Sequence, residues 1–202
     1  MSDVDAGHVS PATMREVCGE FATGVTVITT GGPDEPYGCV ANAVTSVSLD
    51  PPLMLICLAH TASTHQRLTD HGAFVINVLP DTQVGRGICG TFASKAADKF
   101  AEVDHEQGRT GSPVLADSIG WLECTVEHAY ELGDHTAFVG RVVAAERSSG
   151  DPLLFFRGQL RRMRPAPRVT KTAARAAQPG TEDLDLVGEL SSELFFESLA
   201  AR

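Results

Sequence analysis

The sequence predicts a mainly β protein, in which the strands form an antiparallel β-barrel and a few helices lie at its periphery. Runs of β-branched and apolar residues outnumber the helical patterns along most of the chain. These runs do not alternate regularly with helices, as a parallel α/β sheet requires. Gly133-Asp134 separates two long strand-like runs, which is typical of a β-hairpin. Together these three observations favour the antiparallel barrel.

Length and charge set the broad class of protein. The chain has 202 residues, 43% of them apolar, which predicts one domain with a substantial core plus an extension. The net charge of −10 argues against a nucleic-acid-binding protein, whose partner would be a polyanion. The longest apolar run, residues 53–59, is too short to span a membrane. The acidic N-terminus does not resemble a signal peptide, so we expect a cytoplasmic protein.

The spacing of cysteines and histidines indicates neither a disulfide framework nor a metal centre. The five cysteines have no CxxC pair and are interpreted as reduced thiols, mostly in the core. They are Cys18, Cys39, Cys57, Cys89 and Cys124. His60, His65 and His71 are near one another, but spacings of five and six do not place them on one helix face. We therefore expect no metal site.

The first predicted element is a helix that opens at Ser10-Pro11, because serine can cap a helix and proline fits its first position. Gly24 can end this helix in a left-handed turn. Apolar residues follow at helical spacing and predict one apolar face. They are Met14, Val17, Cys18 and Phe21.

Strands dominate the region that follows. Residues 25–29 are β-branched and predict a strand, and the Gly-Gly-Pro-Asp run at 31–34 predicts a turn. Residues 38–48 predict one strand with a face of hydroxyls and amides, which stops at Pro51-Pro52. Residues 53–58 predict a buried strand. The remaining predictions are helices over 64–71 and 82–93 and strands over 74–79, 121–132, 136–146 and 153–156.

Gly85, Gly87 and Gly90 complete a literal GxGxxG match to the dinucleotide-binding fingerprint. In that fingerprint the first glycine directly follows a strand, so that the pyrophosphate meets the next helix. Here residues 80–84 intervene and the βαβ context is missing. We therefore interpret the match as a glycine-rich turn or a loose helix near a ligand.

The end of the chain differs in charge from the rest. Residues 157–175 hold seven basic side chains and no acidic one, whereas residues 182–197 hold six acidic side chains and no basic one. Apolar residues from Leu184 to Leu199 recur at helical spacing. We predict a domain over residues 1–164, followed by a linker and an acidic amphipathic helix over 165–202. This helix is interpreted either as a loosely held tail or as a docking helix.

The residues themselves mark little acid–base chemistry, since the sequence has no nucleophile elbow, no Walker loop and no spaced pair of carboxylates. Hydride transfer between a nicotinamide and a flavin needs little such machinery, because the cofactors carry the chemistry. Residues 42–48 offer polar groups along one strand and its turn. Ser63-Thr64, at a predicted helix start, is a plausible phosphate site. Structural capping of the helix is the alternative for this pair.

Nine short motifs in order resemble the short-chain flavin reductase family, the reductase components of two-component monooxygenases. They are FATGVTVIT (21–29), ANAVTSVSLDPPLMLICL (41–58), ST (63–64), GAFVINVL (72–79), DKF (98–100), GSPVL (111–115), LEC (122–124), GDHTAFVGRV (133–142) and PLLFFRG (152–158). The resemblance covers residues 12 to about 160. It implies an FMN-binding split β-barrel, usually a homodimer. It also implies reduction of FMN or FAD by NADH or NADPH and release of reduced flavin to a partner monooxygenase.

The resemblance also implies which residues contact the flavin. The segment along the isoalloxazine and ribityl chain comprises Ala41, Asn42, Thr45, Ser46, Val47 and Ser48, and the adjacent strand end comprises Cys57, Leu58 and Ala59. Ser63 and Thr64 match the phosphate-side hydroxyls, and Lys99 and Phe100 match a segment near the phosphate or the adenylate end. Val40 stands where relatives often carry threonine, so one hydroxyl contact is missing.

The same resemblance implies a nicotinamide side. His135 is the expected catalytic residue, and Phe155 and Arg157 are expected near the mouth of the site. From pattern alone, Phe155 fits the core equally well, and His135 could simply shape the hairpin turn. Two other functions stay open: a non-catalytic flavin-binding or redox-sensing protein, and an oxidase of the pyridoxamine-phosphate type, which shares the split barrel.

Overall fold

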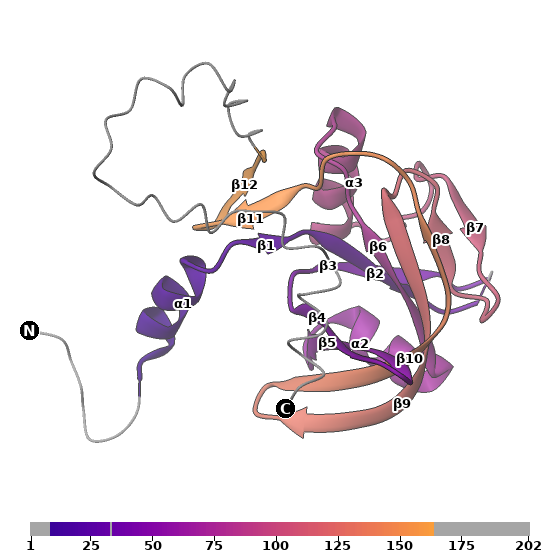
Figure 1. Cartoon of the computed structure of the whole chain (residues 1–202), viewed down its shortest axis with the longest axis horizontal. Coiled ribbons are helices and arrows are strands. Elements are labelled where there is room, and N and C mark those ends of the chain that lie inside the picture. Colours follow the sequence, from indigo (N-terminus) through magenta and orange to yellow (C-terminus); the bar gives the residue numbers. More distant parts are fainter. Residues whose placement is uncertain (1–8, 33, 164–202) are drawn as a thin grey trace, which may run out of the picture. The chain divides into compact units, whose positions relative to one another are not determined.

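Seven antiparallel strands form the main sheet of the protein (Figure 1), in the order β3-β2-β6-β9-β10-β5-β4. The computed structural model describes residues 9–32 and 34–163. The strands of this sheet are β2 (Thr26–Thr30), β3 (Tyr37–Ala41), β4 (Val44–Leu49), β5 (Pro52–Ala59), β6 (Ala73–Val78), β9 (Gly120–Leu132) and β10 (His135–Arg147). The smaller strands are β1 (Thr23–Gly24), β7 (His105–Gln107), β8 (Pro113–Leu115), β11 (Leu154–Phe156) and β12 (Gln159–Arg161). The helices are α1 (Pro11–Gly19), α2 (Ser63–His71) and α3 (Gln83–Ala93).

The sheet is curled, because its two edge strands are consecutive in the sequence. Only Asn42 and Ala43 separate β3 from β4, yet these strands lie at opposite edges of the sheet. Seven strands at a spacing of about 4.8 Å would place the edges of a flat sheet roughly 29 Å apart, which two linking residues cannot span. The Cys57 N–H also donates to the Ala43 carbonyl at 3.0 Å. The predicted antiparallel barrel is confirmed as a split barrel, in which the described β3 and β4 do not pair with each other.

The prediction of one continuous strand over residues 38–48 is wrong. The segment forms two strands, since β3 pairs with β2 whereas β4 pairs with β5. Asn42 and Ala43 carry the chain across the open side of the barrel between them. Periodicity could not show this break, because both halves have the same mixture of small, polar and apolar residues.

The long hairpin of β9 and β10 is confirmed, with Gly133 at φ 65° in its turn. Figure 1 shows the two strands as the longest in the fold. The register shifts between Val139 and Gly140. A Cβ at Gly140 would lie 2.6 Å from Phe74 Cζ and 2.7 Å from Cys124 Cβ, so only glycine lets the strand pack this closely.

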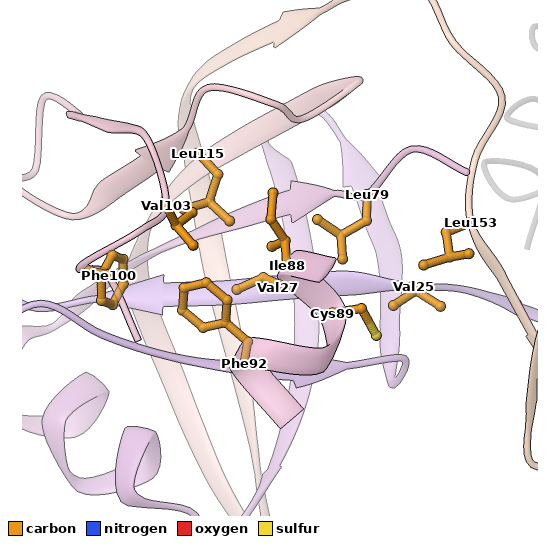
Figure 2. Packing of buried hydrophobic residues seen from close by; sticks show 10 residues of the cluster. All are labelled: Val25, Val27, Leu79, Ile88, Cys89, Phe92, Phe100, Val103, Leu115 and Leu153. Atoms are coloured by element: carbon orange, nitrogen blue, oxygen red, sulfur yellow. The ribbon is translucent and has the colours of Figure 1, made fainter. Parts of the chain in front are cut away.

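Two hydrophobic clusters fill the core on either side of β2. Val27 belongs to the first cluster, which Figure 2 shows with Phe92 and Ile88 of α3 directed at the sheet. Ile28 belongs to the second cluster. Because alternate side chains of a strand face opposite sides, burial on both faces explains why all five residues of β2 are buried. Residues 53–58 were expected to be equally buried, but within β5 only Ile56 and Leu58 are.

Helix α1 begins as predicted and ends earlier than predicted. The Ser10 hydroxyl accepts a hydrogen bond from the Thr13 N–H at 3.1 Å, which confirms the cap. The helix ends at Gly19 rather than Gly24, since Thr23 and Gly24 pair with β11. Its apolar side chains are not covered within the described chain. Met14 and Val17 are 58% and 67% exposed, and Phe21, just after the helix, is 79% exposed.

Helices α2 and α3 confirm the predictions over residues 64–71 and 82–93. The GxGxxG glycines lie within α3, whose N-cap is Thr82. The strand before it, β6, runs antiparallel to both of its neighbours, so the arrangement is not a dinucleotide-binding βαβ unit. A Cβ at Gly85 would collide with the Pro80 carbonyl oxygen, whereas one at Gly87 would meet nothing.

The short strands, the cysteines and the end of the chain complete the comparison with the sequence. The sequence did not indicate β1, β7, β8 and β12, which have two or three residues each and are too short for a periodic pattern. The cysteines are all free: Cys89 and Cys124 are buried, Cys39 and Cys57 are partly buried, and Cys18 is exposed. None of the described helices combines the length and apolar character that crossing a membrane requires. The predicted linker and acidic helix over 165–202 lie outside the described residues.

Candidate functional site

Two adjoining cavities lie between β3, the start of α2 and the segment after α3. The first has a volume of about 490 Å³, and its lining includes Gly38, Ser63, Lys99 and Phe100. The second has a volume of about 570 Å³, and its lining includes Cys39, Val40, Ser63 and Lys99. Because Ser63 and Lys99 line both, the two cavities adjoin, and together they are called the recess. Three residues predicted for the phosphate end of a flavin therefore share one recess.

Lys99 is held at this recess by the backbone on either side of it. Its Nζ donates to the Phe92 carbonyl oxygen at 2.9 Å and to the Gly38 carbonyl oxygen at 3.3 Å. An ammonium group has three donors, so one remains for a ligand among the described contacts. The Asp98 carboxylate accepts from the N–H groups of Phe100 and Ala101, which fixes the turn that carries Lys99. The DKF motif thus forms a hydrogen-bonded turn that places the Lys99 ammonium at the recess.

The start of α2 complements this cation. Its N-cap is Ala62, which has no side chain to cap the helix. The first N–H groups of a helix point outward without intrahelical partners and favour anions. Ser63, the first residue of α2, lines both cavities. Capping by Ser63 or Thr64, the structural alternative, is not what the geometry shows, because no side chain caps this helix.

Thr64 points into the protein rather than into the recess. Its side chain is fully buried, and its hydroxyl has no regular hydrogen-bond partner among the described residues. It lies beside Cys39. Burial raises the pKa of the Cys39 thiol, while the nearby Thr64 hydroxyl and the Lys99 charge act in the opposite direction. Direct contact of Thr64 with a flavin phosphate stays a prediction, and neither cavity is lined by it.

Phe100 lines the first cavity and also belongs to the core. Its ring packs edge-on against Phe92 and against His105, with ring centroids 5.0 Å apart in both pairs. Figure 2 shows Phe100 at one end of the first hydrophobic cluster. The side chain therefore anchors the loop that carries Lys99. Its predicted contact with the flavin stays a prediction.

The strip predicted to lie along the flavin ring follows β3, β4 and β5. Ala41 and Asn42 directly continue the part of β3 that lines the second cavity. The Asn42 amide donates to the Thr23 hydroxyl at 3.3 Å. A register shift between Ser46 and Ser48 places Val47 in a bulge on the edge strand. The other members of the strip are Thr45, Cys57, Leu58 and Ala59. No residue of the strip lines either cavity, so the predicted contact of the strip with the flavin ring stays a prediction.

His135 lies next to this strip. It pairs with Ala59 in the register of β10 and β5. Its Nδ1 is 2.7 Å from the Asp134 carboxylate, and this bond lowers the pKa of Asp134. The carboxylate therefore orients the imidazole ring of His135. The role of His135 on the nicotinamide side stays a prediction. The structure shows that His135 lies beside Ala59, at the end of the strip.

Phe155 and Arg157 lie in another part of the described fold. Phe155 pairs with Thr23 and packs against the first hydrophobic cluster, as its alternative core interpretation predicts. Arg157 binds the Glu20 carboxylate with both Nε and Nη2, at 2.9 Å and 2.6 Å. This ion pair raises the pKa of the Arg157 guanidinium. The structure does not bring Arg157 to the recess, so its expected place at the mouth of the site stays untested.

The sequence did not single out several residues that line the recess, and Gly38 and Tyr37 are two of them. Gly38 lines the first cavity, and a Cβ there would lie 2.5 Å from the Phe92 ring. A glycine inside a strand pattern often marks such a close approach, and this signal was present at residue 38. Tyr37 also lines the cavity, and the Arg67 guanidinium lies 4.4 Å from the centre of its ring. No sequence signal links these two residues.

Comparison with known proteins adds a family to this geometry. The model of the flavin reductase like domain matches residues 18–164, which include β2 to β12 and both cavities. The chain belongs to the flavin reductase family. The family that the order of motifs suggested is therefore confirmed.

Individual relatives agree with this assignment. A "Probable flavin reductase" of Rhizobium meliloti is 41% identical over 92% of this chain, which spans 58% of that longer protein. The reductase subunit HsaB of a flavin-dependent monooxygenase from Rhodococcus jostii is 35% identical over 94% of this chain and 93% of its own. The structure of the Streptomyces globisporus NADH:FAD oxidoreductase in complex with NAD and FAD fragments has a TM-score of 0.73. It is 42% identical, over 82% of this chain and all of its own.

Proposed function

We propose that this flavin reductase oxidises NADH or NADPH, reduces FMN or FAD, and supplies the reduced flavin to a separate monooxygenase. Membership of the flavin reductase family supports this activity. The observation that carries the proposal is the anion site of the recess, where Lys99 faces the uncapped start of α2. A flavin phosphate fits these donors, because an ammonium and free helix N–H groups both favour an anion.

Some residues of the site would bind the flavin, and others would orient the nicotinamide. A bound flavin supplies the hydride-accepting ring, so the protein has to position the reactants and exclude competing reactions. Ser63 and Lys99 would hold the phosphate. The strip from Ala41 to Ser48, together with the end of β5, would lie along the ring. His135, oriented by Asp134, would stand on the nicotinamide side.

The names of two relatives support particular reactants and a partner. The Streptomyces globisporus structure is that of an NADH:FAD oxidoreductase, so we propose NADH and FAD as the preferred pair. The Rhodococcus jostii relative is the reductase subunit of a flavin-dependent monooxygenase, which supports a monooxygenase as the recipient of reduced flavin. We further propose a cytoplasmic location, which the five free cysteines support.

We also propose that the protein is a homodimer. The support is the apolar surface of α1 and the residues just after it, where Met14 and Val17 of the helix and Phe21 beyond its end are mostly exposed in the described chain. Contiguous exposed apolar side chains are uncommon on a monomer and mark contact surfaces. Light scattering of the purified protein should give twice the mass of the chain. A monomeric mass at micromolar concentration would contradict this part of the proposal.

The decisive experiment is an anaerobic assay with each of the four pairs of nicotinamide and flavin. The expected result is oxidation of the nicotinamide together with bleaching of the flavin absorbance, fastest with NADH and FAD. Absence of turnover with all four pairs would overturn the proposal. Bound flavin without turnover would point to the redox-sensing alternative, and oxidation of pyridoxamine phosphate would point to the oxidase.

A further inference from the structure

Three side chains with metal-binding atoms meet at the tip of the long hairpin. His60 follows β5, His65 lies in the first turns of α2, and Glu131 lies near the end of β9. One ligand atom from each lies within 4.8 Å of the other two. The sequence spacing of His60, His65 and His71 gives no metal signature. The third partner is instead a carboxylate that lies far away in the sequence.

Hydrogen bonds already hold these groups together. His60 Nε2 lies 2.8 Å from a Glu131 carboxylate oxygen. The Thr136 hydroxyl donates to the other Glu131 oxygen at 2.8 Å and lies 2.7 Å from His65 Nε2. The rings of His60 and His65 are in edge contact, with centroids 5.2 Å apart. The buried Thr136 thus orients two of the three candidate ligands, as outer partners do in metal sites.

We propose that His60, His65 and Glu131 bind a divalent transition metal ion, with Zn²⁺ as the best match. Two imidazoles and one carboxylate are a common ligand set for Zn²⁺, with a water molecule in the fourth position. Ligand atoms around tetrahedral Zn²⁺ lie roughly 3.3 Å apart. The most widely separated of the three atoms, within 4.8 Å, would therefore close by up to about 1.5 Å, whereas His60 Nε2 and the Glu131 oxygen, now 2.8 Å apart, would separate slightly to admit the ion. The side chains of His60 and Glu131 are 37% and 73% exposed, which gives an ion access from solvent.

The proposed ion would tie three elements together at the edge of the site. The His60 N–H donates to the Asp134 carbonyl at 3.1 Å, so the turn after β5 already contacts the hairpin tip. A metal would add a bond from α2 to the same tip. His135 and Ala59 lie directly beside this junction. We therefore expect the metal to rigidify the rim next to His135 and to raise the melting temperature.

The test is a titration of tag-free, chelator-treated protein with Zn²⁺ alone at pH 7.5, followed by calorimetry. One ion should bind per chain with a dissociation constant below about 10 μM. Glu131→Gln and His60→Gln should each weaken binding at least tenfold, because each removes one of three ligands. The matched control is His128→Gln. This exposed histidine lies three residues before Glu131 on β9, and hence on the opposite face of the strand.

Two further measurements separate this site from other ligands. Cys18→Ser should leave the affinity unchanged, since the exposed Cys18 thiol lies on α1. Binding should weaken at pH 5.5, because imidazoles must lose their protons to bind a metal. Co²⁺ should give the visible absorption of a tetrahedral site in wild-type protein but not in Glu131→Gln.

The outcomes are distinct from those of the activity assay. Absence of stoichiometric binding, or equal losses in His128→Gln and Glu131→Gln, would overturn the proposal. Circular dichroism of each variant without metal checks that the fold is intact. If His60→Gln does not fold, Glu131→Gln carries the test, since its amide retains the size of the exposed carboxylate.

Discussion

Lys99 serves the fold and the candidate site with the same ammonium group. Two of its donors join the end of α3 to β3 through the carbonyls of Phe92 and Gly38. The remaining donor faces a recess whose other side is the uncapped start of α2. An ordinary surface lysine is not held by two backbone carbonyl groups, as Lys99 is. The geometry therefore favours a fixed cation that meets a phosphate.

Removal of this charge should weaken flavin binding. Lys99→Met should raise the dissociation constant for FAD at least tenfold, since a hydrogen bond to a charged group contributes about 1.5–3 kcal/mol. The loss should shrink as salt is added, because salt screens the charge that is lost. Fluorescence titrations at low and high ionic strength measure both effects. Arg147→Met is the control, because it removes an exposed charge that lines neither cavity. Equal losses in the two variants would exclude a positioned phosphate contact.

The buried thiol of Cys124 makes the free energy of unfolding depend on pH in the alkaline range. Burial, followed by the charge of Glu123, raises the pKa of this thiol from 9.0 to about 12. Between these values the unfolded chain loses a proton that the folded protein keeps, so stability falls as the pH rises through this window. The slope for one such group is about 1.4 kcal/mol per pH unit.

Urea unfolding at pH 8, 9 and 10 tests this expectation. Cys124→Ala should lose less stability than wild type between pH 9 and 10, although it is less stable at pH 8 because of the lost packing. Cys18→Ala should follow wild type, since Cys18 is exposed. Parallel curves for wild type and Cys124→Ala would show that the buried thiol does not carry the alkaline sensitivity.

At the scale of the element, two glycines of α3 form a matched pair. A Cβ at Gly87 would meet nothing, so Gly87→Ala should stabilise the protein by about 0.5–1 kcal/mol through better helix propensity. A Cβ at Gly85 would collide with the Pro80 carbonyl, so Gly85→Ala should destabilise by about 1–3 kcal/mol. Denaturant midpoints measure both. Neither change should alter the KM for NADH, and a selective rise in Gly87→Ala would revive the dinucleotide-binding interpretation.

The long elements could be predicted from the sequence, whereas the junctions could not. The hairpin around Gly133-Asp134, the Ser10 cap and helix α2 follow from local chemistry and are confirmed. The break at Asn42 and Ala43 depends on which strands pair, and that is decided across the sheet. The same reason explains α1, where pairing of Thr23 and Gly24 with β11 ended the helix before its predicted stop.

The candidate site was predicted in part, for a similar reason. Ser63 and Lys99 were named from motif order, and the fold brings them into one recess. Thr64 was named with them, but the helix turns its hydroxyl inward toward Cys39. Arg157 was expected near the mouth of the site, which stays a prediction, and its pairing with Glu20, 137 residues away in sequence, could not be foreseen from the motif. Motif order indicates which segments meet, whereas side-chain direction depends on packing.

At the scale of the whole molecule, the described fold contains the full set of reductase motifs. The family match ends at residue 164, and both cavities lie before it. Truncation after Pro165 should therefore leave FAD affinity and free-flavin turnover within about threefold of the full chain, well under 1 kcal/mol of barrier. Steady-state kinetics and size-exclusion chromatography of the truncated protein measure this. A hundredfold loss of turnover in a folded protein would show that residues 166–202 help to build the active site.

The two-residue link between the edge strands has a consequence for how the chain assembles. While the barrel is incomplete, the nearest partner for β3 along the chain is β4, yet the finished sheet keeps them at opposite edges. The local hairpins β2–β3 and β4–β5 can form early, but β6, β9 and β10 must then insert between them. When segments this far apart in the sequence pair, closing the loop between them costs conformational entropy before any contact forms, and this slows folding. A nascent chain therefore has to keep these two hairpins apart until more than half of its residues have been made, which makes direct β3–β4 pairing its most accessible misfolded state.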